Sequence, residues 1–376
     1  MISSVAGGSS AKGKCTSVPL PPTSSPPEGP IAPAVSAPPH SSFEVRGYLP
    51  GDEEALVAMF SSMFRERSLA EWDSLFQRGP AGPADIRILT SDGRTIGSYA
   101  HIPVPAWVEG QQLCLAIGCD LMILPEYRGR GGAELLAKGF LAAEHGCALT
   151  FGVVSEVSGH IAERYLGTTV MGRVPQWTRF RTRGAKRNAL LRSVVTLLER
   201  LYGTVSSWPR PALVVTELER IGSEVDDLAR ESVCFARCIR IRDSAYLRWH
   251  WVEHPEATWR IRAVHAADGA LRGLAVIGVR GEQERRQGVI ADLLARDPGA
   301  LRALVVDAWA RLVEEGCQIV TCTYLDPRPW ARRAMFRSGF RPFPGPLLSC
   351  GPLAPSAGDS VRRLESWYLT HGDTDI

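Results

Sequence analysis

Three closely spaced glycines mark the point where an apolar run gives way to an amphipathic one. The run that begins at Leu121 ends at Pro125, the segment Arg128-Gly-Arg-Gly-Gly-Ala133 follows, and apolar residues then recur at helical spacing to Phe140. This order predicts a strand, a tight loop and a helix. Glycine lets a ligand approach the backbone closely, and the N–H groups at a helix N-terminus point outward. The junction is therefore predicted to bind an anion, and phosphates suit it best.

The context of the loop narrows this prediction. The loop lacks the Lys-Ser/Thr pair of a P-loop and the spacing of a dinucleotide fingerprint, and a structural turn that leads into a core helix is the alternative interpretation. Pro125 stands two positions past Ile123, and Arg128-x-x-Gly131-x-Ala133 leads into the helix. This combination resembles motif A of the Gcn5-related N-acetyltransferase (GNAT) superfamily, with alanine in place of the last glycine.

The resemblance implies a co-substrate, acetyl-coenzyme A or another acyl-coenzyme A, and no metal. N–H groups of the loop would hold its pyrophosphate, while the exposed edge of the preceding strand would pair with the amides of its pantetheine arm. The residues assigned to coenzyme binding on this basis are Leu121, Met122, Ile123, Arg128, Gly129, Arg130, Gly131, Gly132 and Ala133.

Length and composition bound the class of protein. A chain of 376 residues is long enough for two domains, each with its own core. A formal charge of +3 argues against a dedicated nucleic-acid partner. Nine cysteines, an odd number, lie in apolar segments and the chain opens without a signal region, which predicts reduced, buried thiols in a cytoplasmic protein. Cys234 and Cys238, one helical turn apart, are expected to pack in the core rather than to bind a metal.

The predicted fold is α/β (α+β), with two tandem GNAT-like domains, each a mixed, mostly antiparallel sheet flanked by helices. Residues 1–42 are rich in Pro and Ser and are expected to form a disordered tail. Residues 43–183 form the predicted catalytic domain, 184–210 a linker helix and 211–372 a degenerate second domain. No apolar run is long enough to cross a bilayer, and a homodimer is an open possibility.

Within the first domain the pattern predicts a helix capped by Asp52 and an antiparallel meander. A parallel strand pair should then flank the loop, because a helix connects its two strands. The expected segments are strands at 43–48, 86–89, 96–104, 113–123, 148–154 and 174–180, and helices at 133–145 and 160–166.

The second half of the chain repeats the first. Trp72 precedes the turn at Asp92-Gly93, and Trp249 precedes a similar turn at Asp268-Gly269, with a strand on each side of the turn both times. The second copy is expected to hold a helix at 301–315 and a strand at 317–324.

The copies differ at the junction that corresponds to the glycine loop. Pro298 has no N–H to donate there, and Asp297 places a negative charge where phosphates would lie. The second half is therefore predicted not to bind coenzyme A, but to shape the acceptor cleft and support the first half.

Candidate catalytic residues follow from what attack of an amine on a thioester needs: a proton acceptor for the amine and a proton donor for the thiolate. Asp120 precedes the expected coenzyme-binding edge and is the candidate base, with a structural role at a bulge as the equal alternative. Tyr165 is the candidate acid, although it stands two residues before Gly167, where the family pattern has four, and a core tyrosine is the alternative. Glu156 and His160 follow the second parallel strand as candidate acceptor-binding groups or bases, or as solvated residues.

Two classes of function remain. The first is an acyl-coenzyme A-dependent N-acyltransferase, with acetyl as the expected group, acting on the primary amine of a small molecule such as an amino sugar or a secondary metabolite. The second is a non-catalytic acyl-coenzyme A sensor or scaffold. An aminoacyl or peptidyl transferase of the tandem type is disfavoured, because those enzymes lack the glycine loop.

Overall fold

The computed structural model of the chain describes residues 42–143, 146–181, 213–255, 258–281, 286–353 and 359–374. Two expectations fall outside these ranges, namely the tail up to residue 41 and the linker helix at 184–210. Within the described ranges no helix is both long enough and apolar enough to span a membrane.

The first half forms the antiparallel meander that its alternating sequence predicts, followed by a parallel strand pair joined through a helix. One helix is missing from the expectations, α2, which begins after Ser68, whose hydroxyl accepts the Glu71 N–H. The elements are β1 (Phe43–Gly47), α1 (Glu53–Met63), α2 (Leu69–Gln77), β2 (Asp85–Ser91), β3 (Arg94–Val108), β4 (Gln111–Ile123), α3 (Gly132–Leu141), β5 (Leu149–Val154), α4 (Glu156–Leu166) and β6 (Thr169–Phe180).

The second half repeats this order of strands, with an antiparallel set followed by a parallel pair that a helix connects. Its elements are β7 (Val215–Glu217), α6 (Ser223–Glu231), β8 (Cys238–Arg240), α7 (Ser244–Leu247), the π-helical turn η4 (Arg248–Val252), β9 (Arg260–His265), β10 (Leu271–Arg280), β11 (Gln287–Ala295), α8 (Pro298–Glu314), β12 (Ile319–Leu325), α9 (Pro329–Arg337), β13 (Arg341–Pro352), β14 (Trp367–Thr370) and the short helix η8 (His371–Asp373).

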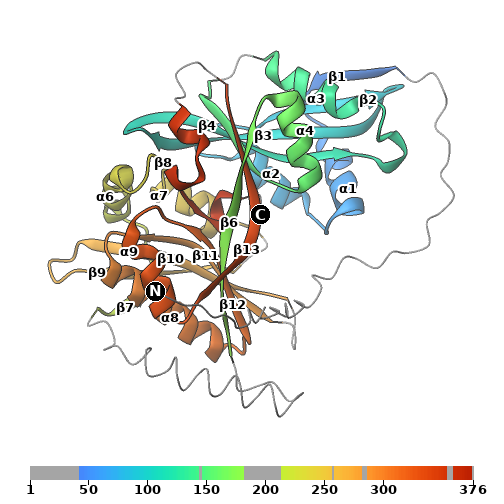
Figure 1. Cartoon of the computed structure of the whole chain (residues 1–376). Helices are drawn as coiled ribbons and strands as arrows, with labels where there is room; N and C mark the ends of the chain where they lie inside the picture. The colour runs from blue at the N-terminus through green and yellow to red at the C-terminus, as the bar shows by residue number, and fades with distance from the viewer. Residues whose placement is uncertain are drawn as a thin grey trace, which may run out of the picture.

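The two halves exchange strands. The sheet runs β1-β2-β3-β4-β5-β13-β6-β12-β11-β10-β9-β7, so β13 of the second half lies between β5 and β6, and β6 of the first half lies between β13 and β12. In Figure 1 these two long strands run side by side through the middle of the molecule and join its upper and lower parts. The sheet is therefore continuous through both halves, while the domain boundaries given above stay a prediction.

Helices cover both faces of the first half's sheet. Ile88 packs in the cluster under α1 and α2, whereas its neighbour Leu89 packs in the cluster with α3 and α4. Successive residues of a strand point to opposite faces, so the two pairs of helices lie on opposite sides. The cluster under α1 and α2 continues into the second half.

Three local expectations need correction. Asp52 stands at the N-cap position of α1, but its carboxylate makes no capping bond because it pairs with Arg46 at 2.7 Å. Helix α3 ends at Leu141, short of residue 145. Helix α4 begins at Glu156 rather than at His160, because a capping box around Ser155 starts it earlier.

The cysteines of the described ranges are free thiols, and most are buried as expected. Cys234 is exposed, so the expectation of burial is wrong there, and Cys238 alone of that pair lies in the core. The sulfurs of Cys114 and Cys147, both half-buried, lie 2.9 Å apart. No group of three or more His, Cys, Asp or Glu side chains among the described residues is placed to hold a metal ion.

Candidate active site

The glycine loop presents its backbone to solvent. Gly129 and Gly131 have φ angles of 74° and 83°, in the left-handed region that favours glycine, and a Cβ at either position would meet no atom within 4 Å. Gly131 occupies the N-cap of α3 and supplies no side-chain capping bond. The N–H groups of the first turn are therefore not capped by this residue. A helix N-terminus of this kind favours anions, and anion binding at this loop stays a prediction.

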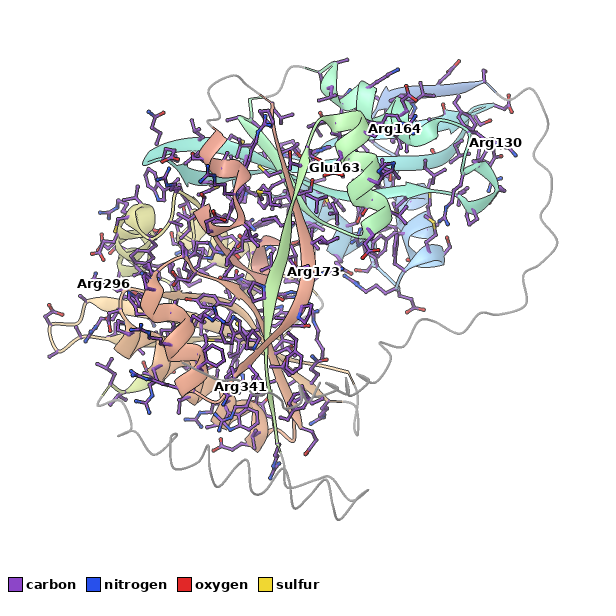
Figure 2. The ribbon with its side chains drawn as sticks, in the orientation of Figure 1. Arg130, Glu163, Arg164, Arg173, Arg296 and Arg341 are labelled. Carbon is purple, nitrogen blue, oxygen red and sulfur yellow. The ribbon has the colours of Figure 1, made fainter. Side chains whose placement is uncertain are left out.

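The neighbouring loop residues play different parts. Gly132 is a packing glycine, since a Cβ there would stand 3.2 Å from the Ile123 side chain. Arg128 donates from Nε to the Ile123 carbonyl at 2.9 Å and so ties the loop to the end of β4. Arg130 is exposed, and Figure 2 shows it at the outer end of the first half. Arg128 is thus hydrogen-bonded within the loop's own structure, whereas the exposed Arg130 has its guanidinium 6.0 Å from the centre of the Tyr127 ring.

Strands β4 and β5 separate next to this loop. They pair only where Leu115–Ile117 meet Leu149–Phe151. Where the two strands part, their backbones are in close contact: a Cβ added to Gly152 would stand only 2.7 Å from the Gly118 carbonyl oxygen. Beyond this point, no strand of the described chain pairs with the β5-facing edge of β4, so Leu121 to Ile123 border a wedge-shaped opening.

A cavity of about 560 Å³ fills this wedge. Its walls include α3 and α4 from one face of the sheet and the α1–α2 region from the other, so it passes through the sheet between the parted strands. The lining residues are Phe60, Met63, Phe64, Arg65, Arg67, Tyr99, Gly118, Cys119, Asp120, Leu121, Ala133, Ala137, Val153, Val154, Ser158, Ile161, Ala162 and Leu166.

Asp120 lies in the wall of this cavity at a bulge. The pairing of β3 with β4 shifts between Ser98 and Ala100, and Asp120 there adopts a φ of 48°. Its carboxylate forms a buried ion pair with Arg67, whose guanidinium lies 3.4 Å from the centre of the Phe60 ring. Asp120 thus lies next to the opening, as a catalytic base would, and also at a bulge, as a structural residue would. Its role as a base stays a prediction.

The other candidate catalytic residues lie on α4, outside the cavity lining. Glu156 is exposed and pairs with Arg173 of β6 at 3.1 Å. His160 is exposed, and Tyr165 is half-buried beside Arg164. The helix turns Ser158, Ile161, Ala162 and Leu166 toward the opening instead. The roles predicted for Glu156, His160 and Tyr165 are untested by this geometry.

Sequence reasoning did not single out Arg67 or Tyr99, which both lie in the cavity wall. Arg67 is recognisable only as the residue before the Ser68 cap, and its pairing with Asp120 depends on tertiary structure. Tyr99 is buried on β3, with its hydroxyl beside Gly118. Burial raises the pKa of the Tyr99 phenol above its usual range, so this group keeps its proton at neutral pH.

At the corresponding junction in the second half, a side chain already caps the backbone donors. The Asp297 carboxylate accepts the N–H groups of Gly299 and Ala300 at 2.8 and 3.1 Å, and it also pairs with Arg272. The backbone donors that face outward at Gly131 are thus capped here by the chain itself.

Comparison with known proteins connects this geometry to a fold. No family model matches the sequence, and no curated protein matches it either. Among solved structures, a probable N-acyltransferase from Enterococcus faecalis and a GCN5-related N-acetyltransferase from Anabaena variabilis each align with a TM-score of 0.59 at 13% identity, covering 83% of this chain and 73% of theirs. A GCN5-related glucosamine N-acetyltransferase region of a fungal β-N-acetylglucosaminidase aligns with a TM-score of 0.52 at 14% identity, covering 84% of this chain and 38% of that one.

The chain therefore has the fold of the GCN5-related N-acetyltransferase superfamily, as the loop sequence predicts.

Proposed function

We propose that this protein is an acyl-coenzyme A-dependent N-acyltransferase that transfers an acetyl group to the primary amine of a small molecule. One observation carries the proposal: the uncapped glycine loop and the parting of β4 from β5 lie at the two ends of the same short segment, Gly118 to Ala133. An elongated ligand with a phosphate at one end can lie along that segment and place its other end in the cavity.

The chain offers suitable groups for each part of such a ligand. The N–H groups from Gly129 to Ala133 would hold the pyrophosphate, with Arg130 as a further positive charge. The unpaired edge of β4 at Leu121 to Ile123 would bind the pantetheine amides, as an added strand does. The apolar part of the cavity would take the acyl group.

In the reaction the amine nitrogen forms a bond to the thioester carbon and the carbon–sulfur bond breaks. The amine must lose a proton, and the departing thiolate gains one. Asp120, Glu156 and His160 remain the proposed proton acceptors or acceptor-binding groups. Tyr165 remains a proposed donor, and Tyr99 joins it because it lines the cavity and keeps its proton.

Replacement of each tyrosine distinguishes the two donors. Tyr99→Phe should lower the turnover rate by about 10² if its hydroxyl protonates the thiolate, whereas Tyr165→Phe should then leave it nearly unchanged. The opposite ranking in steady-state assays would assign the role to Tyr165.

The acceptor class rests on analogy. The fungal structure described above is named for glucosamine, which supports an amino sugar as acceptor, and secondary-metabolite amines remain in the same class. We expect the protein to act in the cytoplasm without a nucleic-acid partner, and a homodimer remains an option.

A sensor that binds acyl-coenzyme A without turnover is the second candidate. It is favoured by two facts, namely that Asp120 is engaged by Arg67 and that Glu156, His160 and Tyr165 do not line the cavity. Thiol release from acetyl-coenzyme A across a panel of amines and amino sugars separates the two. Amine-dependent release supports the transferase, while tight binding without release supports the sensor.

A further inference from the structure

The second half contains a wedge with the same construction as the candidate active site. Strands β11 and β12 pair only where Gln287–Val289 meet Ile319–Thr321, and then part. The strand pair β4 and β5 likewise parts after three paired residues.

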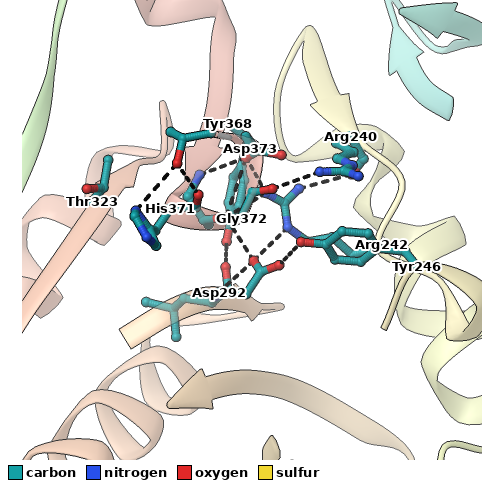
Figure 3. A network of polar contacts seen from close by, with 12 residues as sticks. Arg240, Arg242, Tyr246, Asp292, Thr323, Tyr368, His371, Gly372 and Asp373 are labelled. Atoms are coloured by element: carbon teal, nitrogen blue, oxygen red, sulfur yellow. Dashed lines mark hydrogen bonds and ion pairs between the residues drawn. The ribbon is translucent and has the colours of Figure 1, made fainter. Parts of the chain in front are cut away.

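This second wedge is filled by the end of the chain. Strand β14 pairs with β12, with Thr370 opposite Tyr324 and Leu369 opposite Leu325, and the following helix η8 contacts both β11 and β12. On β11, the Leu293 carbonyl accepts a hydrogen bond from the Tyr368 hydroxyl. Figure 3 shows this segment with Asp292 on one side and Thr323 on the other. We call Trp367–Asp373 the C-terminal plug.

The polar groups under the plug match those in the wall of the first cavity. Gly97 on β3 pairs with Ile123 on β4, and Gly273 on β10 pairs with Ala295 on β11. Asp120 stands three residues before Ile123 and Asp292 three residues before Ala295, so the two aspartates occupy corresponding positions. Each aspartate pairs with an arginine that precedes a helix cap, Arg67 in the first half and Arg242 in the second.

In the second half this ion pair is completed by the plug. Arg242 donates from Nε to Asp292 at 2.8 Å and also forms an ion pair with Asp373 (Figure 3). The Thr370 hydroxyl donates to Asp292 at 2.9 Å, and the Thr370 N–H donates to Asp373 at 2.8 Å. All four residues are buried, so the plug supplies a counter-charge that solvent cannot replace.

The fit around Gly372 leaves no room for a side chain. A Cβ there would contact the Tyr246 hydroxyl and would stand 2.9 Å from the Trp251 ring and 3.0 Å from Asp292. The Gly372 carbonyl accepts a hydrogen bond from the Arg240 guanidinium at 2.7 Å. Glycine is therefore required at this position by space.

We propose that the C-terminal plug is a built-in ligand of the second half. It occupies the place that corresponds to the pantetheine site of the first half, while Asp297 occupies the place of the pyrophosphate. This correspondence rests on the function proposed above for the first wedge. The second half is thus a binding cleft that the chain itself keeps occupied.

The test keeps the chain intact until it has folded. A protease recognition sequence placed within residues 354–358 allows the folded chain to be cut, and gel filtration then shows whether the fragment that carries the plug stays bound. We expect it to stay bound and to be released by Gly372→Ala, with at least about a tenfold weaker Kd, because the added methyl group has no space. Release of the unchanged fragment, with the melting temperature of the remaining protein unaltered, would overturn the proposal.

A second measurement covers the case in which cutting unfolds the protein. In the uncut chain, Gly372→Ala should lower the melting temperature, whereas the control Gly47→Ala, where a Cβ meets nothing within 4 Å, should not. Equal melting temperatures for the two variants would refute a tightly fitted plug. Neither experiment uses acyl-coenzyme A, so its outcome is independent of whether the first half has transferase activity.

Discussion

Replacement of Gly131 by aspartate tests the anion site of the first half most directly. Gly131 is exposed, and a Cβ there meets no atom within 4 Å, so the new side chain fits without a clash. Its φ of 83° costs an ordinary residue about 1 to 2 kcal/mol of stability, somewhat less for aspartate. The folded protein should therefore survive with a modestly lower melting temperature.

The effect on binding is larger. Loss of a charge-assisted hydrogen bond to the pyrophosphate costs about 1.5 to 3 kcal/mol. Repulsion between two negative charges at about 5 Å adds roughly 1 to 3 kcal/mol, depending on whether the effective dielectric constant is nearer 80 or 20. The Kd for coenzyme A should rise by roughly 10² to 10⁴ in total.

The matched control is Gly131→Asn, which places a side chain of the same shape in the same backbone conformation without the charge. Isothermal titration of both variants with coenzyme A isolates the repulsion, which should amount to at least about fivefold in Kd and shrink at high salt. Equal Kd values for the aspartate and asparagine variants would show that no phosphate approaches Gly131, and the assignment of the loop would fail.

Three further predictions concern other parts of the chain. If Asp120 is the base, Asp120→Asn should lower the turnover rate by about 10² to 10⁴ with little change in coenzyme binding. A lower melting temperature with a retained turnover rate would show instead that Asp120 serves only to pair with Arg67. Calorimetry should give one coenzyme A site per chain, because Asp297 caps the corresponding donors of the second half, and two equivalent sites would contradict this. The hydrogen bond from Cys147 lowers the pKa of the Cys114 thiol to about 7, so the thiolate fraction and the alkylation rate of Cys114 should rise as the pH passes through that value. In Cys147→Ala the midpoint of this rise should move toward the ordinary thiol pKa of about 8.5. An unchanged midpoint would contradict an interaction between the two cysteines.

Local chemistry made much of the first half predictable. The loop from Arg128 to Ala133 could be predicted because closely spaced glycines before a helix are compatible with few backbone conformations, and Gly129 and Gly131 do adopt left-handed φ angles. Strand alternation gave the meander, and the charge of Asp297 with the ring of Pro298 indicated a closed second junction. These features depend on a few adjacent residues.

The remaining features depend on contacts between distant residues. The helix with Tyr165 begins four residues earlier than expected, at Glu156, and the side that faces the cavity is set by packing rather than by composition. The pairing of Arg67 with Asp120 joins segments that no local pattern connects. The insertion of β13 between β5 and β6 likewise could not be predicted from the order of the strands along the sequence.

The exchange of β6 and β13 has a consequence for how the protein is made. As the chain leaves the ribosome, the first half can assemble β1 to β5, with β5 paired to β4 on one edge, but the strand that pairs with the other edge of β5 is not synthesised until residues 341–352 emerge. Until then the edge of β5 offers unpaired N–H and C=O groups to any other nascent chain. Slow translation between β6 and β13 should lengthen this exposure, and fragments that end before β13 should aggregate rather than accumulate as a folded first domain.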